Sequence, residues 1–258
     1  MTSFLIGAQL YSMRDRTQTP EALLETLKAL KAAGYTSVQL SGQGDMPDEQ
    51  IAEMLKETGM MVPATHISMD MFENHLDEVI RRHKLWGCGY PGLGGLPGEY
   101  RDSAEGYRAF ARLINPIAKK LRDNGLQFIY HNHAFEFTQF DGVPGYQILM
   151  DSASEDVQFE MDTYWVQAGG GDPAAWIEKL RGRMDVVHFK DMSARADNQT
   201  IMVPGGTGNM NWPRIFEACE KIGVKYAFIE QDNAVETDSL ACMTTAIRSM
   251  SALGGRFQ

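Results

Sequence analysis

Short apolar runs alternate with longer amphipathic stretches along most of the chain. Each longer stretch is rich in Leu, Ala and Lys, most of them end at a glycine, and a β-branched or aromatic run follows a few residues later. Glycine readily adopts the left-handed conformation that often ends a helix, so these glycines indicate turns from helix to strand. The clearest helix has Thr19 as a candidate N-cap, Pro20 at its first position, and Gly34 at its end. The pattern predicts a repeated strand–helix unit.

Eight such units are expected along the chain. The predicted strands cover residues 4–10, 37–40, 62–67, 90–93, 127–132, 157–161, 185–189 and 226–229. The predicted helices cover residues 20–33, 48–58, 74–86, 103–124, 145–152, 173–180, 212–222 and 240–253. Strands that alternate with helices form a parallel sheet. The length alone also allows two smaller domains, but eight units in 258 residues favour one closed (β/α)8 TIM barrel over residues 1–258.

The composition and the net charge argue against several classes of protein. The net charge of -10 argues against a nucleic-acid partner, because such partners are bound by clustered Lys and Arg. No apolar run approaches the roughly 20 residues of a membrane span, and the N-terminus lacks the basic region and cleavage site of a signal peptide. The scattered Cys88, Cys219 and Cys242 suggest reduced thiols and a cytoplasmic protein.

Polar residues gather where the predicted strands end, which is where barrels of this type build their active sites. These positions are Gln9, Tyr11, Gln39, His66, His131, Asn132, His133, Glu136, Glu160, Asp162, His188, Lys190, Asp191, Glu230 and Asp232. Burying so many charges is costly unless a cation or strong pairing offsets them. A divalent metal does so, and oxygen-rich ligation with one imidazole suits Mn²⁺, Mg²⁺ or Co²⁺ better than a structural zinc site.

Four segments carry a family resemblance. They are residues 130–137 (YHNHAFEF), 160–165 (EMDTYW), 188–191 (HFKD) and 229–232 (IEQD). In this order they resemble the sugar phosphate isomerase/epimerase superfamily, the xylose isomerase-like TIM barrels. The resemblance runs from about residue 5 to the C-terminus and is sharpest over 128–232. It implies one divalent metal, preferably Mn²⁺ with Mg²⁺, Co²⁺ or Zn²⁺ as alternatives.

The resemblance also implies which residues bind that metal and move protons. The ligands would be Glu136, Asp162, His188 and Glu230. Glu136 lies a few residues beyond its strand, so His131 or His133 could replace it. Glu136 and Glu230 would act as the acid and base of proton transfer, since metal contact and burial can separate the pKa values of two carboxyls.

Four further residues are expected to bind substrate: His66, His131, His133 and Lys190. His66 could instead form a hydrogen bond across the barrel, and Lys190 could instead act as a buried counter-ion. The two histidines at 131 and 133 could instead support the ligands or pack in the core.

The expected activity is a metal-dependent sugar, sugar phosphate or keto-polyol isomerase or epimerase, which removes a proton next to a metal-bound carbonyl. The main alternative is a dehydratase or lyase on a keto-sugar or inosose, which shares that first step. An abasic-site endonuclease fits less well because position 165 is Trp rather than His and the chain has only six histidines. A non-catalytic sugar-binding barrel would not need the four candidate ligands. The expected partner is a small sugar or polyol, and the sequence is compatible with a homo-oligomer.

Overall fold

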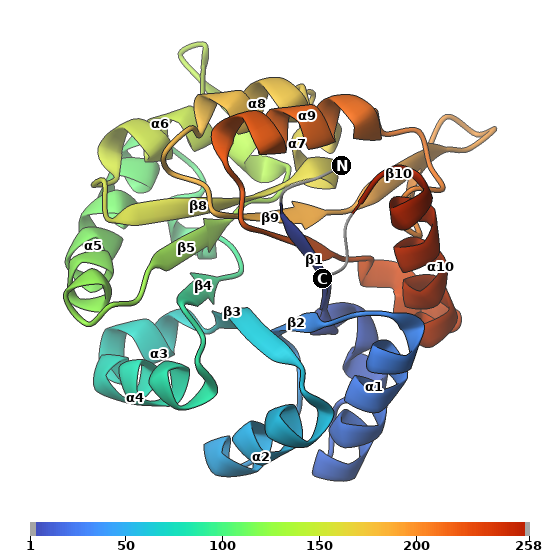
Figure 1. Cartoon of the computed structure of the whole chain (residues 1–258). Coiled ribbons are helices and arrows are strands. Elements are labelled where there is room, and N and C mark those ends of the chain that lie inside the picture. The colour runs from blue at the N-terminus through green and yellow to red at the C-terminus, as the bar shows by residue number, and fades with distance from the viewer. Residues whose placement is uncertain (1–3, 256–258) are drawn as a thin grey trace.

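The computed structural model describes residues 4–255 and shows a closed barrel of eight parallel strands, as predicted (Figure 1). Around the barrel each strand is hydrogen-bonded to two neighbours, and β1 closes the ring between β2 and β12. The barrel strands are β1 (Leu5–Gln9), β2 (Ser37–Leu40), β3 (Met61–Ile67), β4 (Tyr90–Leu93), β5 (Phe128–His131), β8 (Val157–Asp162), β9 (Val186–Phe189) and β12 (Tyr226–Ile229).

The helices surround the barrel and cover its outer face (Figure 1). They are α1 (Pro20–Ala33), α2 (Asp48–Thr58), α3 (Met69–Asn74), α4 (Leu76–Trp86), α5 (Ala104–Asp123), α6 (Gly145–Ser152), α7 (Thr163–Ala168), α8 (Pro173–Lys179), α9 (Trp212–Ile222) and α10 (Ser239–Ala252). The predicted ends of α1 are confirmed, since the Thr19 side chain accepts a hydrogen bond from the Ala22 N–H and Gly34 has a φ of 111°. None of the helices in residues 4–255 has the length and apolar character needed to cross a membrane.

Three features differ from the sequence prediction. The helix predicted over 74–86 is observed as α4 but begins two residues later, because the backbone is not helical at His75, and the unpredicted short helix α3 precedes it with Ser68 as its N-cap. A short helix, α7, follows β8 directly, with Asp162 as its N-cap. Two hairpins were not predicted. They are β6 (Gln139–Phe140) with β7 (Val143–Pro144), and β10 (Asp191–Ala194) with β11 (Thr200–Val203).

The β10–β11 hairpin and the loop after it are held by one buried carboxylate. Asp191 accepts hydrogen bonds from the backbone N–H groups of Met192, Gly206, Gly208 and Met210 and from the Trp212 indole N–H. Several charge-assisted hydrogen bonds to one carboxylate give a strong local restraint. Asp191 therefore fixes the chain that leaves the barrel directly after Lys190.

A small apolar cluster fills the barrel next to the polar strand ends. It consists of Ala64, Ile129, Val186 and Phe228, all fully buried. Side chains two residues apart on a strand point to the same face, and each member precedes a polar residue by two positions. The pairs are Ala64 with His66, Ile129 with His131, Val186 with His188, and Phe228 with Glu230. This cluster, here called the plug, supports the polar layer and closes the barrel beneath it.

Gly7 in β1 makes room for the plug, and a side chain there should destabilise the fold. A Cβ at Gly7 would lie 2.4 Å from Ser37 Oγ and 2.9 Å from Phe228 Cδ1. Overpacking of this kind typically costs about 1–3 kcal/mol, so Gly7→Ala should lower the free energy of unfolding in urea by that amount. Gly89→Ala is the matched control because no atom lies within 4 Å of its Cβ position. Equal free energies of unfolding for the two variants would contradict this prediction and show that the neighbouring side chains move to admit a Cβ at Gly7.

Candidate active site

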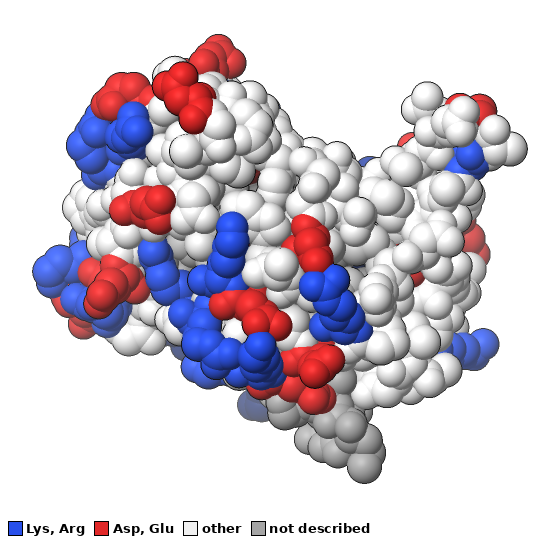
Figure 2. Space-filling model, turned by 90° about the horizontal axis from the view of Figure 1, so that it is seen from above, with Lys and Arg blue, Asp and Glu red and all other residues white. Residues whose placement is uncertain are grey.

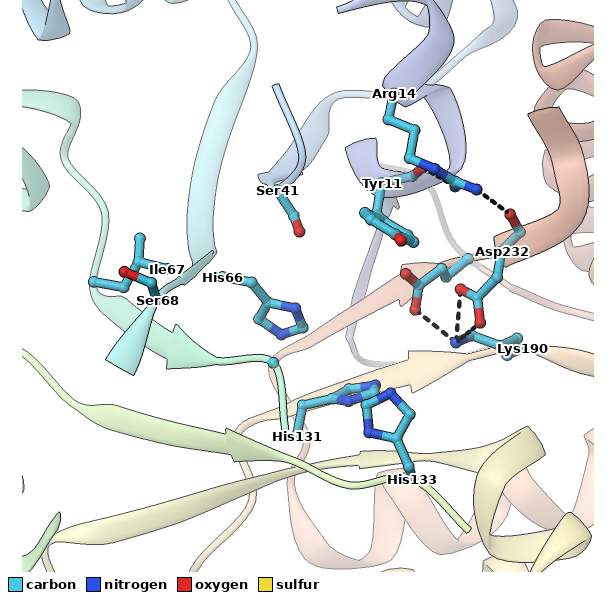
Figure 3. Close-up of a pocket in the computed structure, with 12 residues that line it drawn as sticks. Tyr11, Arg14, Ser41, His66, Ile67, Ser68, His131, His133, Lys190 and Asp232 are labelled. Atoms are coloured by element: carbon cyan, nitrogen blue, oxygen red, sulfur yellow. Dashed lines mark hydrogen bonds and ion pairs between the residues drawn. The ribbon is translucent and has the colours of Figure 1, made fainter. Parts of the chain in front are cut away.

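A cavity of about 440 Å³ opens at the C-terminal end of the barrel (Figure 3). All four residues that the sequence analysis expected to bind substrate line it, namely His66, His131, His133 and Lys190. Glu230 and Asp232 also line it and contact Lys190. Tyr11 and Arg14 lie near Asp232 on the side of β1 (Figure 3). The cavity therefore combines imidazole, ammonium and carboxylate groups in one space.

Four buried side chains in this region place their donor atoms within 4.8 Å of one another: His131, Asp162, His188 and Glu230. They come from the ends of β5, β8 and β9 and from the residue after β12. Three of them are ligands expected from the sequence. The fourth is His131, the alternative to Glu136.

Glu136 does not reach this cluster. It lies in a 3-10 helix (Phe135–Phe137) beyond the end of β5 and is completely buried. Its carboxylate accepts hydrogen bonds from the Tyr130 hydroxyl at 2.5 Å and from the His133 backbone N–H at 2.9 Å. Burial raises the pKa of Glu136 to about 8, although these two hydrogen bonds lower it. The chain turns away from the barrel after His131, which explains why Glu136 does not line the cavity.

Lys190 supplies the positive charge among the acids. Its Nζ lies 3.1 Å from Asp162 Oδ2, 3.0 Å from Glu230 Oε2 and 3.1 Å from Asp232 Oδ1. Burial alone would lower the pKa of Lys190, but the carboxylates of Asp162 and Glu230 raise it above its usual range. Lys190 is therefore a buried counter-ion of these carboxylates, and it also borders the cavity.

His188 contacts acids on both edges of its ring. Its Nδ1 lies 2.8 Å from Glu230 Oε2, and its Nε2 lies 2.6 Å from Gln39 Oε1 and 3.2 Å from Glu160 Oε1. Burial opposes its charged form, but the carboxylates of Glu160 and Glu230 raise its pKa to about 10. A histidine ligand that donates its second N–H to a carboxylate or carbonyl is the usual arrangement around a bound metal.

Gln39 and Glu160 also stand at predicted strand ends, where the sequence indicates no role for them. Both are buried and bonded to each other, with Gln39 Nε2 donating to Glu160 Oε1 at 2.9 Å. Strand alternation already places Glu160, two residues before Asp162, on the same face of β8. Their pairing joins residues 121 positions apart, which a strand pattern cannot reveal.

The donor set fits a divalent ion. It offers two carboxylates and two imidazoles, a mixed oxygen and nitrogen set that first-row divalent metals accept. Nδ1 of His131 is buried and has no hydrogen-bond partner among the described residues. Nε2 of the same ring lies 3.3 Å from Asp162 Oδ2. The ring nitrogen of His131 that faces Asp162 is Nε2, and a metal bound among the four donors would offset the buried charges of Asp162 and Glu230.

A family model described as the xylose isomerase-like TIM barrel matches residues 27–245 of this chain. No curated protein matches the sequence. Solved structures with similar folds include a sugar phosphate isomerase/epimerase from Parabacteroides distasonis, at 21% identity and a TM-score of 0.78, over 98% of this chain and 96% of that one. A probable 3-DHS dehydratase from Bacillus anthracis aligns over 96% and 99% of the two chains, at 13% identity and a TM-score of 0.73. A D-allulose 3-epimerase from Methylomonas sp. aligns over 98% of each chain, at 15% identity and a TM-score of 0.67.

The burial of Glu136 predicts a pH-dependent difference in stability between the wild type and Glu136→Gln. The folded-state pKa of Glu136, about 8, lies above the value of 4.5 that is usual for a glutamate. The folded state therefore keeps a proton that the unfolded state releases, and its stability falls as pH rises from about 4.5 to about 8. Gln cannot ionise and can place its carbonyl toward the His133 N–H and its amide toward the Tyr130 oxygen.

Urea unfolding at pH 5, 6.5 and 8 measures this difference. The free energy of unfolding of Glu136→Gln relative to wild type should rise by about 1–4 kcal/mol across that range. Glu99→Gln, which removes an exposed carboxyl, is the control. Parallel pH profiles for the wild type and Glu136→Gln would show that Glu136 is ionised in the folded protein.

Proposed function

Because the chain belongs to the xylose isomerase-like TIM barrel family, we propose that it is a metal-dependent isomerase or epimerase of a small sugar or keto-polyol. The observation that carries the proposal is the buried four-donor cluster of His131, Asp162, His188 and Glu230 at the wall of the cavity. A cavity of about 440 Å³ suits a small molecule.

The four donors would hold the metal, with Mn²⁺ the preferred ion and Mg²⁺, Co²⁺ or Zn²⁺ as alternatives. When bound, a divalent ion would polarise a substrate carbonyl and acidify the C–H bond beside it. Gln39 and Glu160 would keep His188 oriented by receiving its Nε2–H. Glu136 has no place in this ligand set because its carboxylate faces Tyr130 and the His133 backbone.

Glu230 is the residue that we propose to remove the substrate proton. Of the two carboxylates in the cluster, only Glu230 also lines the cavity. Lys190 and His188 contact the same carboxylate and hold it in place. His66, His133 and Lys190 would contact substrate oxygens, since all three border the cavity. Glu136, expected from the resemblance to be the second proton-transfer residue, does not border it.

A small substrate also agrees with the surface charge. The net charge is -10, and the face shown in Figure 2 has acidic and basic side chains beside one another, without a continuous basic surface. Nucleic-acid binding relies on clustered cations that neutralise phosphates. We therefore propose a small-molecule partner and no nucleic acid.

A dehydratase or lyase is the second candidate. An elimination needs a group that protonates or guides a leaving hydroxyl as well as a base that removes the proton. Lys190 and Asp232 lie directly beside Glu230 on the cavity wall, with Nζ 3.1 Å from both carboxylate oxygens of Asp232. This pair could serve such a leaving group without any change in the metal site.

Metal binding gives the first test of the proposal. Protein purified without chelator should contain about one divalent metal per chain by elemental analysis, as a single mononuclear site requires. His131→Ala and Asp162→Asn should each weaken Mn²⁺ binding by roughly 10-fold or more in calorimetry, while the exposed His75→Ala should not. Two or three zinc ions per chain, or equal binding by all variants, would contradict this site.

The mass of the product separates the two candidate functions. The enzyme with Mn²⁺ is incubated in D2O with ketoses, 3-keto-sugars and inososes, and the products are followed by NMR and mass spectrometry. We expect an isomer of the substrate with deuterium at the altered carbon, and Glu230→Gln should lower turnover by roughly 100-fold. Glu136→Gln is the comparison and should retain more activity, because its carboxyl lies outside the cavity. Products lighter than the substrate, with no isomer from any compound, would establish the lyase instead.

A further inference from the structure

A second polar cluster adjoins the four-donor cluster and consists of Gln39, His66 and Glu160. Glu160 is fully buried. Its carboxylate accepts hydrogen bonds from Gln39 Nε2 at 2.9 Å and from His66 Nε2, and it lies 3.2 Å from His188 Nε2. An ionised carboxylate is only an acceptor. The nitrogen of His66 that faces Glu160 therefore carries a hydrogen atom.

Gln39 fixes the direction of the remaining bonds. Its amide nitrogen donates to Glu160, so its carbonyl oxygen is the atom that accepts from Gln9 Nε2 at 2.8 Å. The same oxygen lies 2.6 Å from His188 Nε2. The Glu160–Gln39 pair thus receives an Nε2–H from two histidines, His66 and His188, and both rings present Nδ1 on the opposite edge.

The two Nδ1 atoms have different surroundings. Nδ1 of His188 faces Glu230 within the four-donor cluster. Nδ1 of His66 has no hydrogen-bond partner among the described residues, and the ring points into the cavity (Figure 3). Gly94 borders the cavity beside this nitrogen, and a Cβ at Gly94 would lie 3.2 Å from it. The absence of a side chain at Gly94 leaves this edge of the ring accessible.

The His66 ring cannot easily turn to exchange its two nitrogens. It stacks on His188 with the ring centroids 5.2 Å apart and an interplanar angle of 29°. It also meets the His131 ring at 64°, again with 5.2 Å between the centroids. A neutral imidazole with its hydrogen on Nε2 has a lone pair on Nδ1. The packing therefore holds a hydrogen-bond acceptor at a fixed point of the cavity wall.

We infer that His66 accepts, through Nδ1, a hydrogen bond from one hydroxyl group of the substrate, and that Glu160 and Gln39 are the positioning residues that hold the ring in the required tautomer. This selects substrates that carry a hydroxyl at that point over analogues that lack it, because the acceptor would otherwise remain unpaired. The identity of the ligand as a polyol rests on the proposed function, whereas the proton position on His66 does not.

Nitrogen NMR of the metal-loaded protein tests the proton position without any substrate. The chain has only six histidines, so labelling histidine with ¹⁵N gives few signals, and His66→Asn identifies those of His66. In protein loaded with Mg²⁺, which is diamagnetic, Nε2 of His66 should carry the hydrogen and Nδ1 should not. Glu160→Gln can donate to Nε2 and should move the hydrogen toward Nδ1. A hydrogen on Nδ1 in the wild type would overturn the inference.

Two substitutions at His66 test the contact with substrate. Asn can place an oxygen near the position of Nδ1, whereas Gln reaches the position of Nε2 and leaves no acceptor in the cavity. Calorimetry would compare D-fructose with its deoxy derivatives, each lacking one hydroxyl, on the Mg²⁺-loaded proteins. In the wild type one derivative should bind roughly 10-fold more weakly, the usual effect of one hydrogen bond. His66→Gln should remove that difference and His66→Asn should retain part of it.

The outcomes separate the inference from the proposed function. Full retention of the preference in His66→Gln, with the variant folded by circular dichroism, would overturn the contact. Failure of D-fructose to bind the wild type would count against both the proposed function and the contact, while the NMR result would still decide the tautomer. The inference is supported if Nε2 of His66 carries the hydrogen and if the preference for the hydroxyl is lost in His66→Gln but partly kept in His66→Asn.

Discussion

The arrangement of this barrel depends on neutralising acids that the fold buries. Glu160, Asp162 and Glu230 are almost completely removed from water at one end of the barrel. Isolated buried carboxylates are very costly, and each tolerates burial only with a partner of opposite charge or with strong donors. Lys190 pairs with Asp162 and Glu230, and His188 lies between Glu160 and Glu230. Each of these side chains is therefore positioned by the charges around it as well as by its strand.

The barrel itself was largely predictable because local signals repeat in every unit. Helix ends carried recognisable caps such as Thr19 and Gly34, and the eight predicted strands correspond to the observed ones. The β10–β11 hairpin could not be predicted in this way, since its strands are only partly buried. It is fixed by hydrogen bonds to Asp191 from residues up to 21 positions away, and no periodic pattern records them.

The candidate site was predictable where it follows strand alternation. His188 and Asp162 lie on inward-facing positions of their strands, and Glu230 continues that alternation just after its strand. His131 also has this alternation, two residues after Ile129 of the plug. Glu136 lies beyond the strand in a 3-10 helix, where alternation no longer determines direction. The roles of Gln39 and Glu160 depend on a contact across the barrel, which only the closed structure brings together.

The plug has a consequence for how sequences of this barrel can change. Each plug residue and its polar partner are two positions apart, so inserting or deleting one residue between them would turn one of the pair to the opposite face of its strand. A charged group would then enter the apolar outer layer, or an apolar group would replace a site residue. Point substitutions leave this order intact, and changes of chain length are tolerated in loops. Divergence should therefore change residues within these strands, as far as packing allows, more readily than it changes the lengths of the strands.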